Sequence, residues 1–147
     1  MTAELPLACS VRECGLPLAR RERAYVCAAG HSFNIARSGY VNLLQPQDRR
    51  SLKAGDPKAA VEARAALDRA GVGHTVINAV IDRIAALRLS DDVTAVDLGS
   101  GSGEMLSLLC QAPRIHGIGI DLSVAAADSA ARRFPELTWI VANADRR

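Results

Sequence analysis

A glycine-rich turn between an apolar run and a helical pattern constrains the fold of this 147-residue chain most strongly. The apolar run Val93–Leu98 is followed by three glycines with one residue between each, Gly99, Gly101 and Gly103. A strand, a glycine turn and a helix in this order allow backbone N–H groups to approach a ligand closely. The turn therefore predicts a nucleotide-type cofactor site at the carboxyl end of a strand.

The segments around this turn alternate between strand and helix patterns. The apolar runs predict strands over Val93–Leu98, Ile115–Ile120 and Leu137–Ala142, and the patterns between them predict helices over Glu104–Gln111 and Val124–Arg133. Such alternation is typical of an α/β fold with a parallel, Rossmann-like sheet. Because an open sheet of this type needs further strands to complete its ligand crevice, we expect the domain that ends at Arg147 to be incomplete.

Two helices are expected before the first of these strands. Asp56 followed by Pro57 predicts an N-cap with proline at the first helical position, and Gly71 is placed to end a helix over residues 59–70. The second helix carries an apolar strip at a 3.6-residue period, which we expect to be buried against the sheet. The strip consists of Val76, Ile77, Val80, Ile81, Ile84 and Leu87.

Carboxylates at the ends of two strands accompany the glycine turn. Asp97 ends the first strand, and Asp121 follows the second strand 24 residues later. The spacing is neither the Gly-x-Gly-x-x-Gly of dinucleotide folds nor a P-loop, and it favours a ligand with an amino-acid end. Asp121 is expected to accept hydrogen bonds from both ribose hydroxyls. After the third strand, Asn143 or Asp145 is placed to meet the adenine amine, unless each is merely a solvated strand end.

Three cysteines and one histidine near the N terminus have the spacing of metal ligands. They follow the pattern Cys9-x4-Cys14-x12-Cys27-x3-His31. Three thiolates and one imidazole suit a closed tetrahedral structural zinc site. The alternative is that these are unrelated buried thiols and a surface histidine. Cys110 falls on the apolar side of a predicted helix and is expected to be a core thiol.

Composition and charge suggest how the chain is divided. We predict a small zinc-binding module over residues 1–45, a polar linker over residues 46–56, and an incomplete α/β domain over residues 57–147. Residues 1–55 contain eight Lys/Arg and four Asp/Glu, whereas residues 56–147 contain ten and twelve. The basic front fits attraction to a phosphate backbone, and a solvated surface is the alternative. Aromatic residues are 3% of the chain, which argues against a broad base-stacking surface.

The sequence contains neither a signal-peptide pattern nor an apolar run of membrane-spanning length. These observations predict a cytoplasmic protein, in which cysteines stay reduced and serve as metal ligands or core thiols.

Four motifs connect the chain to one known family. They are Cys-x4-Cys with Cys-x3-His, the stretch Phe33–Leu44 that contains Gly-Tyr-Val-Asn-Leu-Leu, Gly55-Asp56 followed by Ala63-Arg64, and Val96–Gly103. On these motifs the sequence resembles the rRNA large-subunit methyltransferase A family, which methylates guanine N1 in 23S rRNA. The resemblance implies a zinc module joined to a class I methyltransferase domain. It further implies Zn(II) and S-adenosylmethionine as cofactors, and a 23S rRNA hairpin as partner.

The resemblance also implies roles for individual residues. The zinc ligands would be Cys9, Cys14, Cys27 and His31, and the cofactor pocket would be shaped by Asp97, Gly99, Gly101, Ser102, Gly103 and Asp121. Methyl transfer to guanine N1 needs a group that accepts the N1 proton. That base is expected in the missing half of the domain, so no catalytic residue is assigned.

Two alternative functions stay open. The first is a truncated protein that binds zinc and RNA without catalysis, and the second is a class I methyltransferase with a small-molecule or protein substrate. A homodimer is a further option, because an open strand at the edge of an incomplete sheet can pair with another chain.

Overall fold

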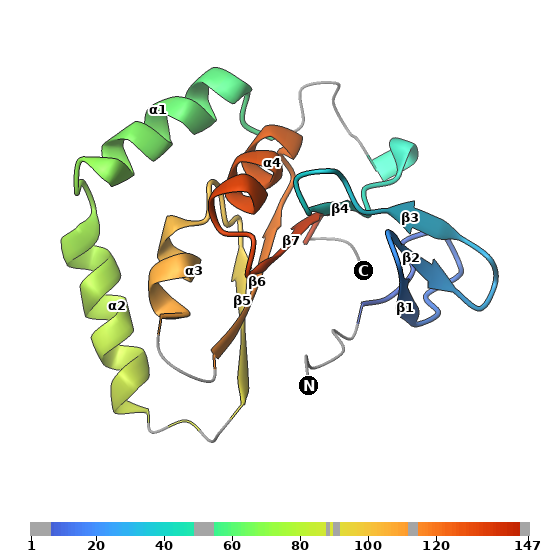
Figure 1. Cartoon of the computed structure of the whole chain (residues 1–147), viewed down its shortest axis with the longest axis horizontal. Coiled ribbons are helices and arrows are strands. Elements are labelled where there is room, and N and C mark those ends of the chain that lie inside the picture. Colours follow the sequence, from blue (N-terminus) through green and yellow to red (C-terminus); the bar gives the residue numbers. More distant parts are fainter. Residues whose placement is uncertain (1–6, 49–54, 88, 90–91, 112–114, 145–147) are drawn as a thin grey trace.

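The computed structural model describes residues 7–48, 55–87, 89, 92–111 and 115–144, which form two sheets and four α-helices (Figure 1). The first sheet is antiparallel, with the order β1-β2-β3. Its strands are β1 (Leu18–Arg21), β2 (Ala24–Cys27) and β3 (Ser32–Asn34).

The second sheet is parallel, with the order β4-β7-β6-β5. Its strands are β4 (Val41–Asn42), β5 (Val93–Leu98), β6 (Ile115–Asp121) and β7 (Thr138–Val141). Helix α3 (Glu104–Leu109) connects β5 to β6, and α4 (Val124–Arg133) connects β6 to β7. The predicted strand–helix alternation and the parallel α/β fold class are therefore confirmed.

Strand β4 comes from the N-terminal part of the chain but lies in the parallel sheet. Val41 pairs with Ile140 of β7, and the Leu43 N–H donates to the Val141 carbonyl. A 3-10 helix, η1 (Pro46–Asp48), follows β4. The predicted division at residues 45 and 56 stays a prediction, and residues 49–54 of the linker lie outside the described residues.

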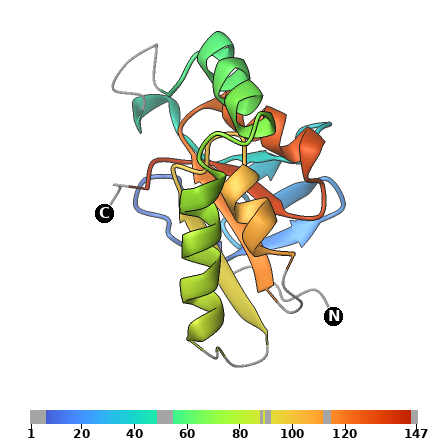
Figure 2. The same ribbon diagram turned by 90° about the vertical axis from the view of Figure 1, so that its left-hand side faces the viewer.

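The parallel sheet is covered on both faces. On one face, Trp139 packs with Leu106 of α3 and with Ala130 and Ala131 of α4. On the other face, the antiparallel sheet packs against β6 and β7, so that Phe33 shares a core with Ile118 and Ile140. Figures 1 and 2 show the same arrangement, with the parallel sheet between the helices and the three-stranded module. The three-stranded N-terminal module therefore covers the face of the parallel sheet on which open α/β folds usually carry a second layer of helices.

Helix α1 (Lys58–Arg69) begins differently from the prediction. Pro57 is the N-cap residue rather than the first helical residue, and no side chain caps the helix. The Asp56 carboxylate instead forms an ion pair with Arg64, which lies almost two helical turns inside α1. The helix ends as predicted, because Gly71 follows the C-cap with a left-handed backbone (φ 82°).

Helix α2 (His74–Ala86) corrects a second prediction. Within its expected apolar strip Ile77 is buried, but Val76 is 68% exposed and Leu87 is 66% exposed. The helix packs against α3, which itself covers the sheet, so α2 does not bury its strip on the sheet (Figure 2). None of the described helices is long and apolar enough to cross a membrane.

Candidate functional site

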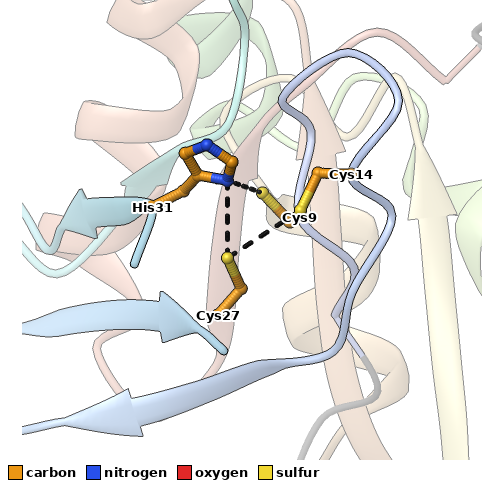
Figure 3. Close-up of side chains that lie close together, drawn as sticks. All are labelled: Cys9, Cys14, Cys27 and His31. Carbon is orange, nitrogen blue, oxygen red and sulfur yellow. Dashed lines mark hydrogen bonds between the residues drawn. The ribbon is translucent and has the colours of Figure 1, made fainter. Parts of the chain in front are cut away.

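The four predicted metal ligands come together between the antiparallel sheet and the N-terminal turn (Figure 3). Their ligand atoms all lie within 4.8 Å of one another. The His31 Nδ1 is 3.5 Å from the Sγ of Cys9 and 3.5 Å from the Sγ of Cys27, and the Cys14 and Cys27 sulfurs are 3.9 Å apart.

The three distances of 3.5–3.9 Å fit a tetrahedral zinc ion. Zinc–sulfur bonds of about 2.3 Å and zinc–nitrogen bonds of about 2.0 Å place neighbouring ligand atoms roughly 3.5–3.8 Å apart. The donor set of three sulfurs and one nitrogen is also that of closed structural zinc sites. The residues therefore fit Zn(II), which would join two turns that are distant in sequence.

Each pair of ligands is held by a tight backbone turn. The Cys14 N–H donates to the Val11 carbonyl at 3.0 Å, and the Gly30 N–H donates to the Cys27 carbonyl at 3.0 Å. Gly30 has a φ of 83°, a left-handed conformation that glycine adopts without strain. The two turns thereby aim their ligands at one point.

The protein environment gives two of the thiols different pKa values. Burial raises the pKa of Cys9 to about 11. Burial also acts to raise the pKa of Cys27, but hydrogen bonds from the backbone N–H groups of His31 and Ala29 lower it to about 7. Because zinc binds thiolates, metal binding at this site would release protons.

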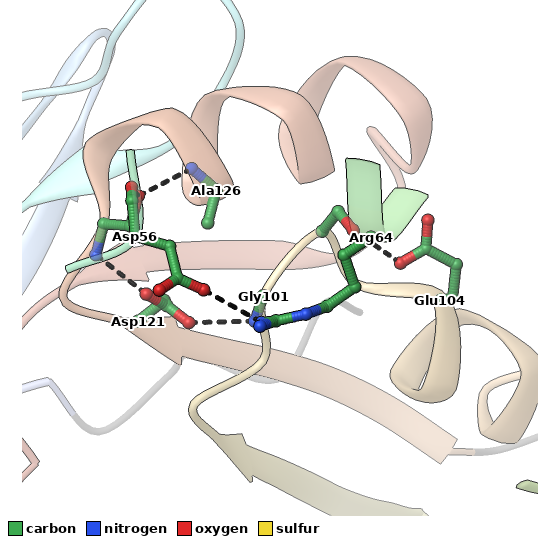
Figure 4. A network of polar contacts seen from close by, with 8 residues as sticks. Asp56, Arg64, Gly101, Glu104, Asp121 and Ala126 are labelled. Atoms are coloured by element: carbon green, nitrogen blue, oxygen red, sulfur yellow. Dashed lines mark hydrogen bonds and ion pairs between the residues drawn. The ribbon is translucent and has the colours of Figure 1, made fainter. Parts of the chain in front are cut away.

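The glycine turn lies against the end of β6 (Figure 4). The Gly99 N–H donates to the Ile120 carbonyl at 2.8 Å, and the Gly101 N–H donates to Asp121 Oδ2 at 2.9 Å. Asp121 Oδ1 accepts from the Ser123 N–H at 2.7 Å. The structure therefore brings the predicted glycine turn and the predicted carboxylate into direct contact.

Asp97 lies near the end of β5, two residues before Gly99. Its pKa is raised by burial and by the nearby negative charge of Asp121. Two carboxylates next to a glycine turn form a site with an acidic field, which suits a ligand that carries positive charge.

Ser102 and Gly103 are buried on the side of the glycine turn that faces the core, not on the side that faces solvent. Ser102 is buried and donates to Glu104 Oε2 at 2.8 Å, and Glu104 forms an ion pair with Arg133. A Cβ on Gly103 would overlap the Trp139 ring. Both residues support the turn from below, and their cofactor role stays a prediction.

Asn143 follows β7 at the same edge of the sheet. The neighbouring Ala142 N–H donates to the Asp121 carbonyl at 3.1 Å, so the chain leaves β7 beside the end of β6. Asn143 is half-buried. Asp145, the alternative partner for the adenine amine, lies outside the described residues.

The sequence alone indicates no ligand role for Asp56 or Arg64. The Arg64 Nη1 is 3.0 Å from Asp56 Oδ2 and lies over Gly101 (Figure 4). Both residues occur in the family motifs, but nothing in the linear spacing shows that α1 reaches the glycine turn. The Asp-Pro pair instead suggested a helix cap.

The chain is similar to known proteins over most of its length. Residues 8–52 match the zinc-ribbon family described as RlmA, N-terminal. The chain is 35% identical over 134 residues to the 23S rRNA (guanine(748)-N(1))-methyltransferase of Streptomyces fradiae, covering 88% of this chain and 46% of that protein. It is 36% identical over 141 residues to a protein of Micromonospora griseorubida that is also named as a 23S rRNA (guanine-N(1)-)-methyltransferase, covering 83% of this chain and 46% of that protein.

Part of the chain also aligns with solved structures. A TehB-like SAM-dependent methyltransferase from Corynebacterium glutamicum aligns with a TM-score of 0.45 and 22% identity, covering 59% of this chain and 47% of that one. The chain spans about half the length of the curated relatives it matches. Residues 8–52 therefore match the RlmA N-terminal zinc-ribbon family, and most of the chain is similar to 23S rRNA guanine-N1 methyltransferases.

Proposed function

We propose that this chain is part of an enzyme that transfers a methyl group from S-adenosylmethionine to guanine N1 of 23S rRNA. The observation that carries the proposal is the contact between the glycine turn and Asp121 at the carboxyl ends of β5 and β6. Ligands of open parallel sheets bind at this edge. The similarity to a 23S rRNA guanine-N1 methyltransferase supplies the reaction and the substrate.

Each part of the site has a role in this proposal. Asp121 accepts from the ribose hydroxyls, Asp97 faces the cationic end of the cofactor, and Asn143 meets the adenine. Gly99 and Gly101 let the backbone approach the ligand, while Ser102 and Gly103 hold the turn. The four zinc ligands staple the N-terminal module, and S-adenosylmethionine supplies the methyl group. Since methyl transfer from a sulfonium depends mainly on alignment, these positioning roles account for much of the chemistry.

The first test is calorimetric titration of S-adenosylmethionine into the zinc-loaded chain. We expect saturable binding that is lost or weakened at least tenfold in Asp121→Ala, because two strong acceptors for the ribose are removed. Asp82→Ala, which removes an exposed carboxylate of α2, is the matched control. Absence of binding by a folded, zinc-containing chain would contradict the cofactor assignment.

The second test is methyl transfer to 23S rRNA, using a protein that contains this chain and has the full length of its relatives. Mass spectrometry of nuclease digests should reveal 1-methylguanosine within a hairpin. Methylation of a small molecule or a protein instead would favour the alternative methyltransferase. RNA binding without methylation would favour the alternative of a non-catalytic binding protein.

A basic turn of the zinc module supports contact with RNA. Arg20, Arg21 and Arg23 lie at the turn between β1 and β2, and they line a depression together with Glu22, Ala24 and Asn34. All three arginines are exposed. Guanidinium groups suit recognition of phosphate oxygens.

Replacing these three arginines by alanine should weaken binding to an rRNA hairpin and flatten its salt dependence, since each lost phosphate contact reduces the slope by about 0.7–0.9. Arg132→Ala is the control, because that exposed arginine pairs with Asp128 on the opposite face of the sheet. An unchanged salt slope in the triple variant would exclude this turn as the RNA contact.

We further propose that the enzyme is cytoplasmic. We also propose that its zinc module ends at residue 45 and that its linker ends at residue 56.

A further inference from the structure

Arg64 extends from α1 over the glycine turn (Figure 4). Its Nη1 lies 4.0 Å from the position that a Cβ on Gly101 would occupy. The side chain is 60% exposed, so the guanidinium retains N–H donors beyond the one that meets Asp56. A positively charged group is thus available at the open side of the turn.

The position of Arg64 is fixed by the segment before α1. Its partner Asp56 is anchored because the Ser123 Oγ donates to the Asp56 carbonyl at 2.7 Å. Gly55 packs closely against the start of α4: a Cβ on Gly55 would lie 2.6 Å from the Cα of Ser123, the N-cap residue of that helix. Because the Ser123 N–H also donates to Asp121, one network connects Arg64 to the proposed ribose carboxylate.

The proposed site needs a positively charged group for the carboxylate of the cofactor. Asp97 and Asp121 supply negative charge, while Arg133 is engaged by Glu104 beneath the turn. S-adenosylmethionine carries a sulfonium, an ammonium and a carboxylate, and the carboxylate would be repelled by the two aspartates. Among the residues described at the turn, Arg64 has the charge and the exposure to bind it.

We propose that Arg64 binds the carboxylate of the methionyl end of S-adenosylmethionine, and that Asp56 is the residue that positions it. This inference rests on the proposed function. A guanidinium can hold a carboxylate through two parallel N–H donors while a further N–H stays on Asp56. The contact would orient the amino-acid end of the cofactor without touching its reacting methyl group.

The test compares S-adenosylmethionine with decarboxylated S-adenosylmethionine, which keeps the adenosine, sulfonium and amine and lacks only the carboxylate. Calorimetric titration should show that the zinc-loaded wild-type chain prefers S-adenosylmethionine. Arg64→Ala should bind S-adenosylmethionine about ten- to hundredfold more weakly, as expected for the loss of charge-assisted hydrogen bonds, and should bind the decarboxylated ligand unchanged. Arg64→Lys should recover part of the preference, and Asp56→Asn should lose part of it.

Arg69→Ala is the matched control, because Arg69 is an exposed arginine at the end of the same helix. Equal weakening of both ligands in Arg64→Ala would show a merely structural role and overturn the inference. Unchanged binding of both ligands would also overturn it. Failure of the wild-type chain to bind either ligand would instead contradict the proposed cofactor site itself.

Discussion

Asp97 is a half-buried carboxyl at the end of β5, where burial and the charge of Asp121 raise its pKa. A raised pKa in the folded state means that ionisation of Asp97 costs stability. The cost appears as the pH rises from the ordinary aspartate value, about 3.9, through the folded-state value, and it persists at neutral pH.

We therefore expect Asp97→Asn to raise the melting temperature at pH 7 and to have less effect near pH 4, where the wild-type carboxyl is protonated. The same variant should weaken S-adenosylmethionine binding, since it removes a charge from the site. Thermal unfolding followed by circular dichroism at several pH values measures the first effect, with Asp82→Asn as control. A lower melting temperature at pH 7 would show that the carboxylate makes a stabilising contact.

Trp139, the single tryptophan of the chain, is seated on two glycines. A Cβ on Gly119 would overlap its ring, and the ring Nε1 donates to the Phe134 carbonyl at 2.9 Å. Gly119→Ala should therefore cost about 1–3 kcal/mol of folding free energy, as overpacking of a core does. Urea unfolding followed by Trp139 fluorescence measures the wild type and this variant.

The steric origin of this cost can be checked by removing the ring. In a Trp139→Leu background, followed by circular dichroism, Gly119→Ala should be nearly neutral. An equal cost in both backgrounds would point to a backbone effect instead.

At the scale of elements, the zinc module and the parallel sheet share a core. Cys9 and Cys27 lie in one apolar cluster with Ile118 of β6 and Ile140 of β7. Structural zinc contributes on the order of 10 kcal/mol in zinc-finger peptides, so a metal-free module should not keep this cluster closed.

We expect Cys9→Ser to abolish zinc binding and to lower hydrogen-exchange protection in β6 and β7 as well as in β1 to β3. The loss of stability should be at least a few kcal/mol, since metal binding and packing are coupled. Elemental analysis and amide exchange provide the measurements, and Cys110→Ser is the control because Cys110 lies outside the metal cluster. Unchanged exchange in β6 and β7 would show that the sheet is stable without the module.

For the whole molecule, one edge of the parallel sheet carries exposed apolar residues. Strand β5 is an edge of the described sheet, with Val96 54% exposed and Leu98 63% exposed. Exposed apolar surface beside an open strand edge promotes association. We expect the isolated chain to self-associate through this edge, and Val96→Lys with Leu98→Lys to reduce that association.

Sedimentation velocity over a range of concentrations measures this effect. Arg20→Ala, on the zinc module, is the control and should leave the association unchanged. Identical association by the double-lysine variant would place the contact on another surface, and a monomeric wild-type chain would exclude the homodimer.

Local pattern alone determined much of this protein. Apolar periodicity predicted β5 and α4 at their observed bounds, because side-chain spacing along a strand or helix is a local property. The cysteine and histidine spacing predicted the metal cluster, because its donor chemistry admits few alternatives. Only the tertiary structure decided the pairing of β4 with β7, the exposure of α2, and the placement of Arg64 over Gly101. Each of these depends on contacts between segments far apart in the sequence, and the periodicity of one segment does not specify which partner covers it.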